Sequence, residues 1–314
     1  MMIYIYKDEV CLKRNDSSVS ISKNNCILQQ IPIKLIEAVI IFGRTSISTE
    51  LIKTLTQNGI NIFYCSKSGR LNAITNSFSL SNTNTRLSQY NIYINYDKRL
   101  SMAKQICRDK INLQIALLSK KRSIDKQHIR TIKKYLSSLS LYNDINSIMG
   151  IEGCCAREYF NAMSEITEFS KRIRHPARDP LNSILDLSYT LILGEITSVL
   201  SSMGFDVSIG FLHEIKNGRP SLALDVLEYF RVYADGFAIN AFNRREFNSK
   251  DFNITEKTCR LTDAGFKKYI KKFSHAVQIS DKIFSICNNL KKDVLERGCQ
   301  NGQKPEPKPL YNCV

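Results

Sequence analysis

The segment "DPLNSILDLSYTLILGEITSVLSSMG", residues 179 to 204, decides the class of fold. Asp179 is a typical helix N-cap, Pro180 suits the first helical position, and Gly204 directly follows the helical pattern. Apolar residues between them recur at steps of three and four, which predicts a helix over residues 180–203. This is the clearest helix of the chain, and the segments around it share its periodicity.

Helical periodicity continues on both sides of this segment, from about residue 96 onward. It predicts further helices over residues 96–121, 122–142, 152–170, 220–232 and 263–297. Residues 96–300 are therefore predicted to form an all-α domain. The remaining residues, 301–314, are rich in proline and lysine, and we expect a disordered tail there.

Residues 1–80 follow a different pattern. Short runs rich in β-branched and aromatic residues predict strands, namely "MIYIYK", "SSVSIS", "CILQQIPI", "EAVIIFG", "INIFYC" and "GRLNAIT". One helix is predicted among them at "SISTELIKTLTQNG", residues 46–59. Residues 81–95 are predicted to be a linker, because Asn, Ser and Thr dominate this part of the chain. The expected fold class is α+β, with a small β-rich domain followed by a larger all-α domain.

The charge of the chain indicates the kind of partner. The 314 residues carry a formal net charge of +16, which favours a polyanionic partner such as nucleic acid. Residues 97–134 hold twelve Lys or Arg side chains against three acidic ones. A well-solvated helix face is the alternative explanation. A membrane surface is disfavoured, because this stretch lacks a strong apolar face.

The ten cysteines are spread over the chain and form no CxxC pair, so we expect reduced thiols rather than disulfides or a zinc site. The N-terminus lacks the pattern of a signal peptide, and no stretch of about 18 apolar residues is evident. The sequence therefore predicts a cytoplasmic protein with no membrane partner.

A first candidate for chemistry lies in "MGIEGCCAREYFNAM", residues 149–163. Glu152 stands between Gly150 and Gly153, which predicts a carboxylate at the mouth of a helix, where it suits a ligand. The alternative is that Glu152 only complements the positive end of the helix dipole.

A second candidate is "HEIKNGRPSLALDVLEYF", residues 213–230. His213 follows an apolar segment and is a candidate ligand. The alternative is a histidine that is only packed at the edge of the core. Asp225 and Glu228 are three apart and share a helix face. The alternative is that this face is simply exposed to solvent. Their apolar neighbours instead indicate burial, and buried acids must be paired or bind a cation.

These candidates together favour one kind of chemistry. Two carboxylates and an imidazole fit Mg²⁺ or Mn²⁺ better than zinc and leave positions for phosphate oxygens. Such a metal would polarise a phosphodiester and activate water or a sugar 3′-hydroxyl. Spacing alone does not bring Glu152 and His213 together.

Four segments resemble, in order and spacing, the CRISPR-associated spacer-acquisition integrase family called Cas one. They are "IIFGRTSISTELIKTLTQNGINIFYCSKSGRL", "GIEGCCAREYF", "RHPARDPLNSILDLSYTLI" and "MGFDVSIGFLHEIKNGRPSLALDVLEYFR". The resemblance implies a metal-dependent DNA integrase and endonuclease of CRISPR adaptation, which inserts short duplex DNA into a repeat array by 3′-hydroxyl transesterification. It implies a homodimer formed through the β-rich domain, with a small ferredoxin-like partner called Cas two.

The resemblance also assigns roles to residues of this chain. Glu152, His213 and Glu228 match the family's ligands for Mg²⁺ or Mn²⁺, and Asp225 matches an auxiliary acid of the catalytic site. Asn182 and Tyr189 match a segment that we interpret as structural support, whereas His175 is interpreted as non-catalytic. The expected DNA contacts are Lys216, Arg219, Arg174, Arg178, Lys120, Lys121 and Arg122. For Lys216 and Arg219 a solvated turn is the alternative.

Three other functions remain open at this point. A casposon-type integrase of a mobile element shares the same catalytic core and usually carries an additional C-terminal module, for which only the short tail is present. A non-catalytic DNA-binding scaffold would use its acids only to pair with arginines. A general structure-specific nuclease would cut DNA without joining it.

Overall fold

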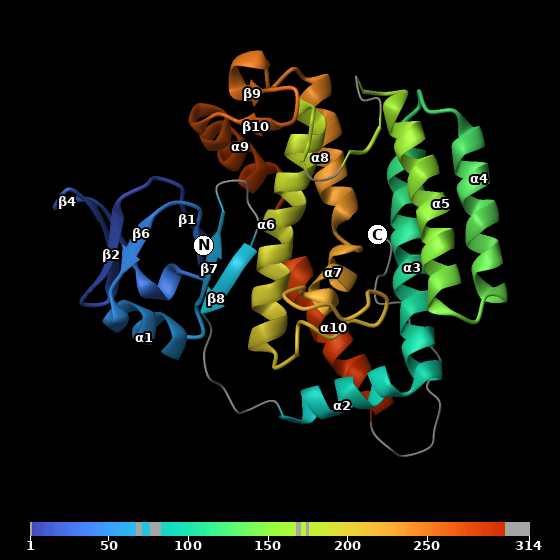
Figure 1. The fold of residues 1–314 in the computed structure, drawn as a ribbon, viewed down its shortest axis with the longest axis horizontal. Coiled ribbons are helices and arrows are strands. Elements are labelled where there is room, and N and C mark those ends of the chain that lie inside the picture. The colour runs from blue at the N-terminus through green and yellow to red at the C-terminus, as the bar shows by residue number, and fades with distance from the viewer. Residues whose placement is uncertain (1, 67–70, 76–82, 168–170, 174–175, 299–314) are drawn as a thin grey trace.

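The computed structural model describes residues 2–66, 71–75, 83–167, 171–173 and 176–298. Strands fill the first part of the chain and helices most of the rest, so the predicted α+β class is confirmed. In Figure 1 the N-terminal strands lie on one side of helix α6 (Pro180–Ser202), and helices α3 to α5 lie on the other. The sequence segment that decides the fold class is therefore also the centre of the molecule.

The N-terminal strands form two four-stranded sheets. The first has the order β1-β5-β7-β8, with β8 antiparallel to β7 and the other pairs parallel, and the second has the order β4-β3-β2-β6. The strands are β1 (Met2–Ile5), β2 (Val10–Asn15), β3 (Ser18–Lys23), β4 (Cys26–Pro32), β5 (Ala38–Ile41), β6 (Thr45–Ile47), β7 (Asn61–Cys65) and β8 (Leu71–Thr75). All six predicted strands are present, whereas β2 and β6 were not predicted.

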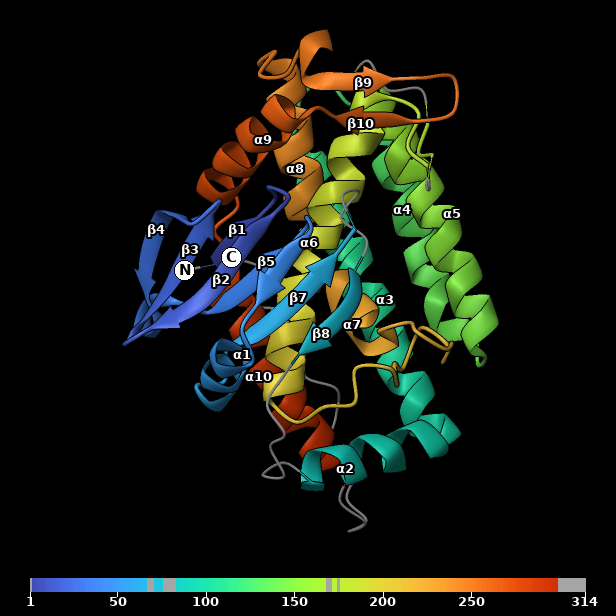
Figure 2. The same cartoon turned by 60° about the vertical axis from the view of Figure 1, so that its left-hand side comes forward.

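The sheet that contains β5 buries both of its faces. Val39 and Ile41 belong to the core of the β-rich region, whereas Ala38 and Ile40 belong to the core of the helical region. Because side chains alternate along a strand, the apolar run of β5 serves two cores at once. Figure 2 shows this sheet beside α6, and Asn61 on β7 donates a hydrogen bond of 2.7 Å to the hydroxyl of Ser198 on α6.

The helices begin and end close to many of the predicted limits. They are α1 (Thr49–Gln57), α2 (Thr83–Ile94), α3 (Tyr96–Ser119), α4 (Lys126–Ser138), α5 (Ile145–Ser164), α6 (Pro180–Ser202), α7 (Ser221–Leu227), α8 (Arg231–Asn243), α9 (Asp263–Ala276) and α10 (Ser280–Gly298). Asp179 caps α6 by accepting a hydrogen bond from the backbone N–H of Asn182, as predicted. A short hairpin, β9 (Phe252–Ile254) and β10 (Cys259–Leu261), lies between α8 and α9.

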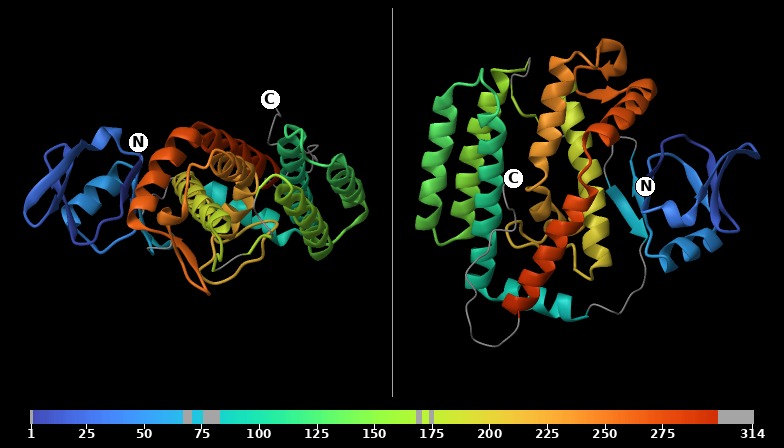
Figure 3. Two further views of the ribbon diagram at one scale, coloured as in Figure 1. Left: turned by 90° about the horizontal axis from the view of Figure 1, so that it is seen from above. Right: turned by 180° about the vertical axis from the view of Figure 1, so that it is seen from behind.

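Helix α6 is long and apolar enough to cross a membrane by length and composition. Two thirds of its most apolar window is buried inside the molecule, where α7, α8 and α10 pack against it. Figure 3 shows α10 running beside α6 when the molecule is seen from behind. The core of the helical region therefore accounts for the apolar character of α6.

Most of the predicted linker, residues 81–95, is helix α2 instead. The side-chain amide of Gln89 donates to the carbonyls of Asp206 and Ile209 at 2.8 and 2.7 Å. Ser88 packs so closely on Gly298 of α10 that a Cβ on that glycine would lie 2.3 Å from the Ser88 Cβ. Tertiary contacts of polar side chains thus stabilise a helix that local composition disfavours.

Three predicted helices have different limits in the structure. Helix α5 begins at Ile145 rather than at residue 152, because Asp144 caps it by accepting from the Ser147 N–H at 2.8 Å. The predicted helices 220–232 and 263–297 are each divided in two, into α7 and α8 and into α9 and α10. The eight described cysteines are free thiols, and the predicted tail, residues 301–314, lies outside the described residues.

Candidate active site

Glu152 lies inside helix α5, in its third turn, rather than at a helix mouth. The prediction of a carboxylate at the mouth of a helix is therefore wrong, and so is the alternative that it complements the helix dipole, which acts within the first turn. Adding a Cβ to Gly150 or Gly153 would meet nothing within 4 Å outside the helix backbone. The two glycines leave the helical face around Glu152 uncovered.

A buried lysine joins Glu152 to the second carboxylate of the site. Lys110 on α3 forms ion pairs with Glu152 and with Glu228, and its Nζ lies 2.5 Å from the Glu228 Oε2. Burial lowers the pKa of Lys110, but the two carboxylates outweigh this effect and raise it above its ordinary value. The ammonium is therefore charged, and two acids from different helices converge on it.

Glu228 lies at the junction between α7 and α8, where it is the C-cap residue of α7. Its side chain is 4% exposed and also accepts from the Arg231 Nε at 2.8 Å. Burial raises the pKa of Glu228, yet the charges of Arg231 and Lys110 outweigh it and hold this pKa well below its usual range. Glu228 is therefore an ionised carboxylate inside the protein.

Asp225 holds His213 in place from the preceding turn of α7. Its Oδ1 lies 2.7 Å from the His213 Nδ1 and 2.9 Å from the backbone nitrogen of the same residue, and its Oδ2 accepts from the Phe211 and Leu212 N–H groups. A ring that donates its Nδ1–H to Asp225 presents a lone pair at Nε2. That Nε2 lies 4.0 Å from the Glu228 Oε1.

Gly210 makes this arrangement possible. A Cβ at this position would lie 2.8 Å from the Asp225 Oδ2 and from the carbonyl of Ser221. Contacts under 3 Å are not tolerated between such atoms, so only glycine lets the Asp225 carboxylate reach the backbone N–H groups that follow. Sequence reasoning missed Gly210, because its role depends on a helix eleven or more residues away.

The donor set suits a divalent cation. Two carboxylates already converge on one positive charge, and the free ring nitrogen of His213 lies near one of them. Oxygen ligands with one imidazole are typical of Mg²⁺ and Mn²⁺ sites. With the Lys110 ammonium between the acids, no three His, Cys, Asp or Glu side chains of the described residues stand close enough to hold an ion.

Sequence reasoning missed Lys110 as a member of the site, since it was counted within the basic stretch 97–134 that was expected to face DNA. Its neighbours at helical spacing, Ile106, Cys107, Leu113 and Gln114, are all buried. Lysine at the centre of such a stripe was the available signal for burial. Other members of the stretch are also engaged inside the molecule, such as Arg99, whose Nε donates to the Phe211 carbonyl.

The predicted DNA contacts are placed unequally. Lys216, Arg178, Lys120 and Arg122 are exposed, Arg219 and Lys121 are half-buried, and Arg174 lies outside the described residues together with His175. Lys121 donates to the side chain of Asn240 at 3.2 Å. Lys216 and Arg219 belong to the turn between His213 and α7, so they are the predicted contacts nearest in sequence to the site.

Asn182 and Tyr189 on α6 support the surroundings of the site. The Asn182 side chain is fully buried and accepts from the backbone N–H of Ile173 at 3.1 Å. The Tyr189 hydroxyl donates to buried Asp235, and its ring lies under the guanidinium of Arg231, 4.7 Å from the ring centroid. Tyr189 therefore contacts the arginine that pairs with Glu228.

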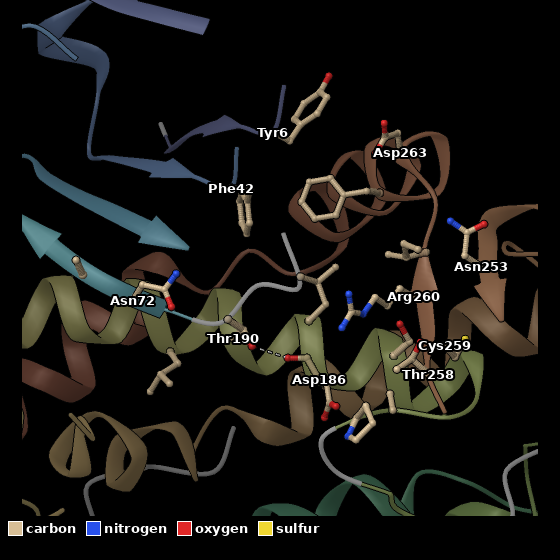
Figure 4. A pocket seen from close by; sticks show the side chains of 18 of the residues that line it. Tyr6, Phe42, Asn72, Asp186, Thr190, Asn253, Thr258, Cys259, Arg260 and Asp263 are labelled. Atoms are coloured by element: carbon tan, nitrogen blue, oxygen red, sulfur yellow. Dashed lines mark hydrogen bonds between the residues drawn. The ribbon is translucent and has the colours of Figure 1, made fainter. Parts of the chain in front are cut away.

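A separate cavity of 1410 Å³ lies between the β-rich region and the helical region. Figure 4 shows Arg260 from β10 and Asp186 and Thr190 from α6 along its wall. Glu152, His213 and Glu228 do not line it, whereas Arg219 does. The turn that follows His213 thus contributes to the wall of this cavity.

The chain matches one protein family over most of its length. The model of the family "CRISPR associated protein Cas1" matches residues 3–275. A curated relative from Thermus thermophilus, named CRISPR-associated endonuclease Cas1 3, is 31% identical over an alignment of 277 residues. The alignment covers 86% of this chain and 82% of that protein. That name describes the Thermus protein as an endonuclease.

Solved structures share the fold. A CAS1 protein from Thermotoga maritima is 21% identical with a TM-score of 0.85, covering 97% of this chain and all of that one. A casposase bound to an integration product has a TM-score of 0.82 at 23% identity, covering 100% of this chain and 96% of that one. A Cas6-RT-Cas1–Cas2 complex has the same score and identity, covering 95% of this chain and 35% of that one.

At these identities the structural likeness shows the fold, whereas the family model and the curated relative show the family. Both match most of this chain, and the residues matched by the family model include Lys110, Glu152, His213 and Glu228. The chain therefore belongs to the CRISPR associated protein Cas1 family.

Proposed function

We propose that this protein is a divalent-metal-dependent DNA integrase and endonuclease of CRISPR adaptation, which inserts short duplex DNA into a repeat array. The observation that carries the proposal is that Glu152 and Glu228 both pair with the Lys110 ammonium. The Nε2 of His213 lies 4.0 Å from the Glu228 Oε1. The curated relative is named an endonuclease, and the structural neighbours include a casposase bound to an integration product. Both names describe cleavage or joining of a phosphodiester.

Glu152, Glu228 and His213 would hold Mg²⁺ or Mn²⁺. When bound, such an ion polarises a phosphodiester and stabilises the charge that develops during displacement. Asp225 orients the His213 ring and fixes its proton on Nδ1, so that Nε2 can act as a ligand. Arg231 neutralises one carboxylate oxygen of Glu228 and keeps this side chain directed at the site.

The reaction that fits this site is transesterification. A 3′-hydroxyl at the end of a short duplex attacks a phosphodiester of the repeat, forms a new P–O bond and releases the old 3′-hydroxyl. The number of phosphodiester bonds is unchanged, so no external energy source is needed. With water as nucleophile, the same site would cut DNA instead.

The partners follow from the same proposal. Double-stranded DNA would lie along Lys216, Arg219, Arg178 and the exposed basic end of α3, and a homodimer would form through residues 1–80. The solved Cas1–Cas2 complex supports a small ferredoxin-like partner of the Cas2 kind. We place the protein in the cytoplasm of a prokaryote.

A half-site integration assay tests the proposal. Purified protein and its small partner are mixed with a labelled duplex and a supercoiled plasmid that contains the repeat, with and without Mg²⁺ or Mn²⁺. We expect covalently joined label only when metal is present, and none with Glu228→Ala. DNA affinity of that variant should stay close to that of the wild type, and unchanged integration would refute the proposed metal site.

A non-catalytic DNA-binding scaffold is the second candidate. It is favoured by one observation: Glu228 already pairs with both Lys110 and Arg231, as acids of a purely structural cluster would. The same assay separates the candidates, because a scaffold binds DNA but never joins or cuts it. Label that is cut but never joined would instead indicate a general nuclease.

The casposon-type integrase remains a third candidate. The casposase chain is covered over 96% of its length, so an additional module does not distinguish it from this protein. The two roles differ in their target, which is a CRISPR repeat for one and the insertion site of a mobile element for the other. Integration into a plasmid with a scrambled repeat is the distinguishing control.

A further inference from the structure

Lys110 is the member of the site to which the proposed function gives no task. Its side chain is 5% exposed, and its ammonium pairs with both Glu152 and Glu228. A lysine is rarely buried to this degree unless it is paired, and here both partners are residues to which we assign metal binding. The ammonium therefore occupies the space between two acids that a divalent cation would also need.

The charges around this ammonium are balanced without any metal. Glu152 and Glu228 face Lys110 and Arg231, so two negative charges meet two positive ones. Asp225 is satisfied separately, by three backbone N–H groups and the His213 ring. Adding two positive charges beside an ammonium that stays in place would be strongly unfavourable in a buried site.

We propose that Lys110 is a built-in counter-cation, which holds Glu152 and Glu228 together in the metal-free protein and is displaced from between them when a divalent cation binds. This inference rests on the proposed metal site. Metal binding is then an exchange of one cation for another rather than the filling of a vacant position. In the metal-free state the ammonium also offsets the repulsion between the two carboxylates.

The exchange has a direction in the structure. Glu152 is the more exposed carboxylate at 22%, whereas Glu228 is 4% exposed and is also held by Arg231. An ion from solvent therefore meets Glu152 first, and the flexible lysine stem allows the ammonium to withdraw along α3. A monovalent ion brings no more charge than the ammonium it would replace, so the exchange favours divalent ions.

The first experiment measures Mn²⁺ binding by isothermal titration calorimetry, without DNA. Lys110→Met removes the charge and keeps an unbranched stem of similar length. Arg108→Met is the matched control, because it removes one positive charge from the exposed face of the same helix. Glu228→Gln shows whether the measured ion occupies this site, since binding there should be lost.

We expect Lys110→Met to lower the Mn²⁺ dissociation constant by about tenfold or more, because the competing cation is gone. Arg108→Met should leave it within about twofold, because long-range charge is screened. Equal affinity of wild type and Lys110→Met would overturn the inference and leave the metal site standing. No Mn²⁺ binding by either protein would overturn the inference together with the metal site of the proposed function.

A second experiment uses the wild-type protein and does not depend on the folding of a variant. An amine-reactive reagent is applied with and without saturating Mn²⁺, and the labelling of each lysine is quantified by mass spectrometry. Lys104, half-buried on the same helix, is the internal reference. Labelling of Lys110 should rise at least about threefold when Mn²⁺ binds, because a displaced amine loses its two partners. Labelling that stays the same with bound Mn²⁺ would overturn the displacement.

Discussion

At the residue scale, the position of His213 depends on a glycine that has no chemistry of its own. Gly210 leaves room for the Asp225 carboxylate, which in turn accepts from the backbone and the ring of His213. The site therefore rests on backbone geometry as well as on charged side chains.

We predict that Gly210→Ala lowers strand transfer by about 10- to 100-fold, because the new methyl group displaces Asp225 and with it the His213 ring. The measurement is the half-site integration assay at saturating metal. Gly194→Ala on α6 is the control, since a Cβ there meets nothing within 4 Å outside the helix backbone. Full activity of Gly210→Ala would contradict the role given to Asp225.

At the scale of single elements, helix α5 carries two glycines in its interior on either side of Glu152. Glycine costs about 1 kcal/mol relative to alanine inside a helix. Because a Cβ at Gly153 would meet no atom of the surrounding protein, we predict that Gly153→Ala raises the free energy of unfolding by about that amount. Chemical denaturation measures the change.

The same variant separates two roles of Gly153. If DNA approaches the helix at this face, Gly153→Ala will be more stable than the wild type but weaker in integration. If the glycine has no such role, stability will rise and integration will be unchanged. A loss of stability would contradict the helix that the structure places there.

Helices α4 and α5 are joined by a histidine between two acids. The His128 Nδ1 lies 2.7 Å from Glu158 and its Nε2 lies 2.8 Å from Glu165. Burial lowers the pKa of His128, but hydrogen bonds and charges from Glu165 and Glu158 outweigh it and raise this pKa above its ordinary value. The contact therefore stabilises the fold when the ring is protonated.

This shift gives a pH dependence with a definite sign. Since the folded-state pKa of His128 is raised, its contribution is complete below the pKa of the unfolded chain and is lost as pH rises through the folded-state value. We predict that His128→Gln lowers the melting temperature more at about pH 6 than at about pH 9. Equal losses at both pH values would show that the charge of the ring does not matter.

At the scale of the whole molecule, only part of the excess positive charge is available to contact DNA. Lys110 is committed to the acids and Arg99 to a backbone carbonyl, whereas the loop after α3 keeps its basic side chains near solvent. We define the three basic residues of this loop, Lys120, Lys121 and Arg122, as the α3 end cluster; Lys120 and Arg122 are exposed and Lys121 is half-buried. Together with other exposed basic residues of the stretch, such as Arg108 and Lys126, this cluster is suited to phosphate contacts.

We predict that replacing all three residues of the α3 end cluster by alanine weakens DNA binding and reduces the slope of log affinity against log salt by about 2 to 3. Fluorescence anisotropy with a short duplex over a range of salt concentrations measures both. The matched control replaces Lys13, Lys34 and Lys53, exposed lysines of the β-rich region, and should leave the slope nearly unchanged. Equal effects of the two triple variants would indicate that only net charge matters.

Much of the fold could be read from local patterns. The apolar run of β5, the caps of α6 and the glycine at position 59 that ends the first predicted helix depend on neighbouring residues, so the sequence shows them directly. Helix α2 could not be predicted in this way, because the buried amide of Gln89 is hydrogen-bonded to carbonyls 117 and 120 positions away. Propensity describes a segment by itself and carries no information on such distant partners.

The sequence by itself determined the α+β class and, through the family resemblance, proposed Glu152, His213 and Glu228. Only the tertiary structure decided what surrounds them: Lys110 between the two acids, Arg231 against Glu228, and Asp225 behind His213. The physical reason is that these contacts join α3, α5 and the junction of α7 with α8. The apolar pattern of a helix predicts which of its faces is buried, whereas the packing of the helices decides which faces contact one another.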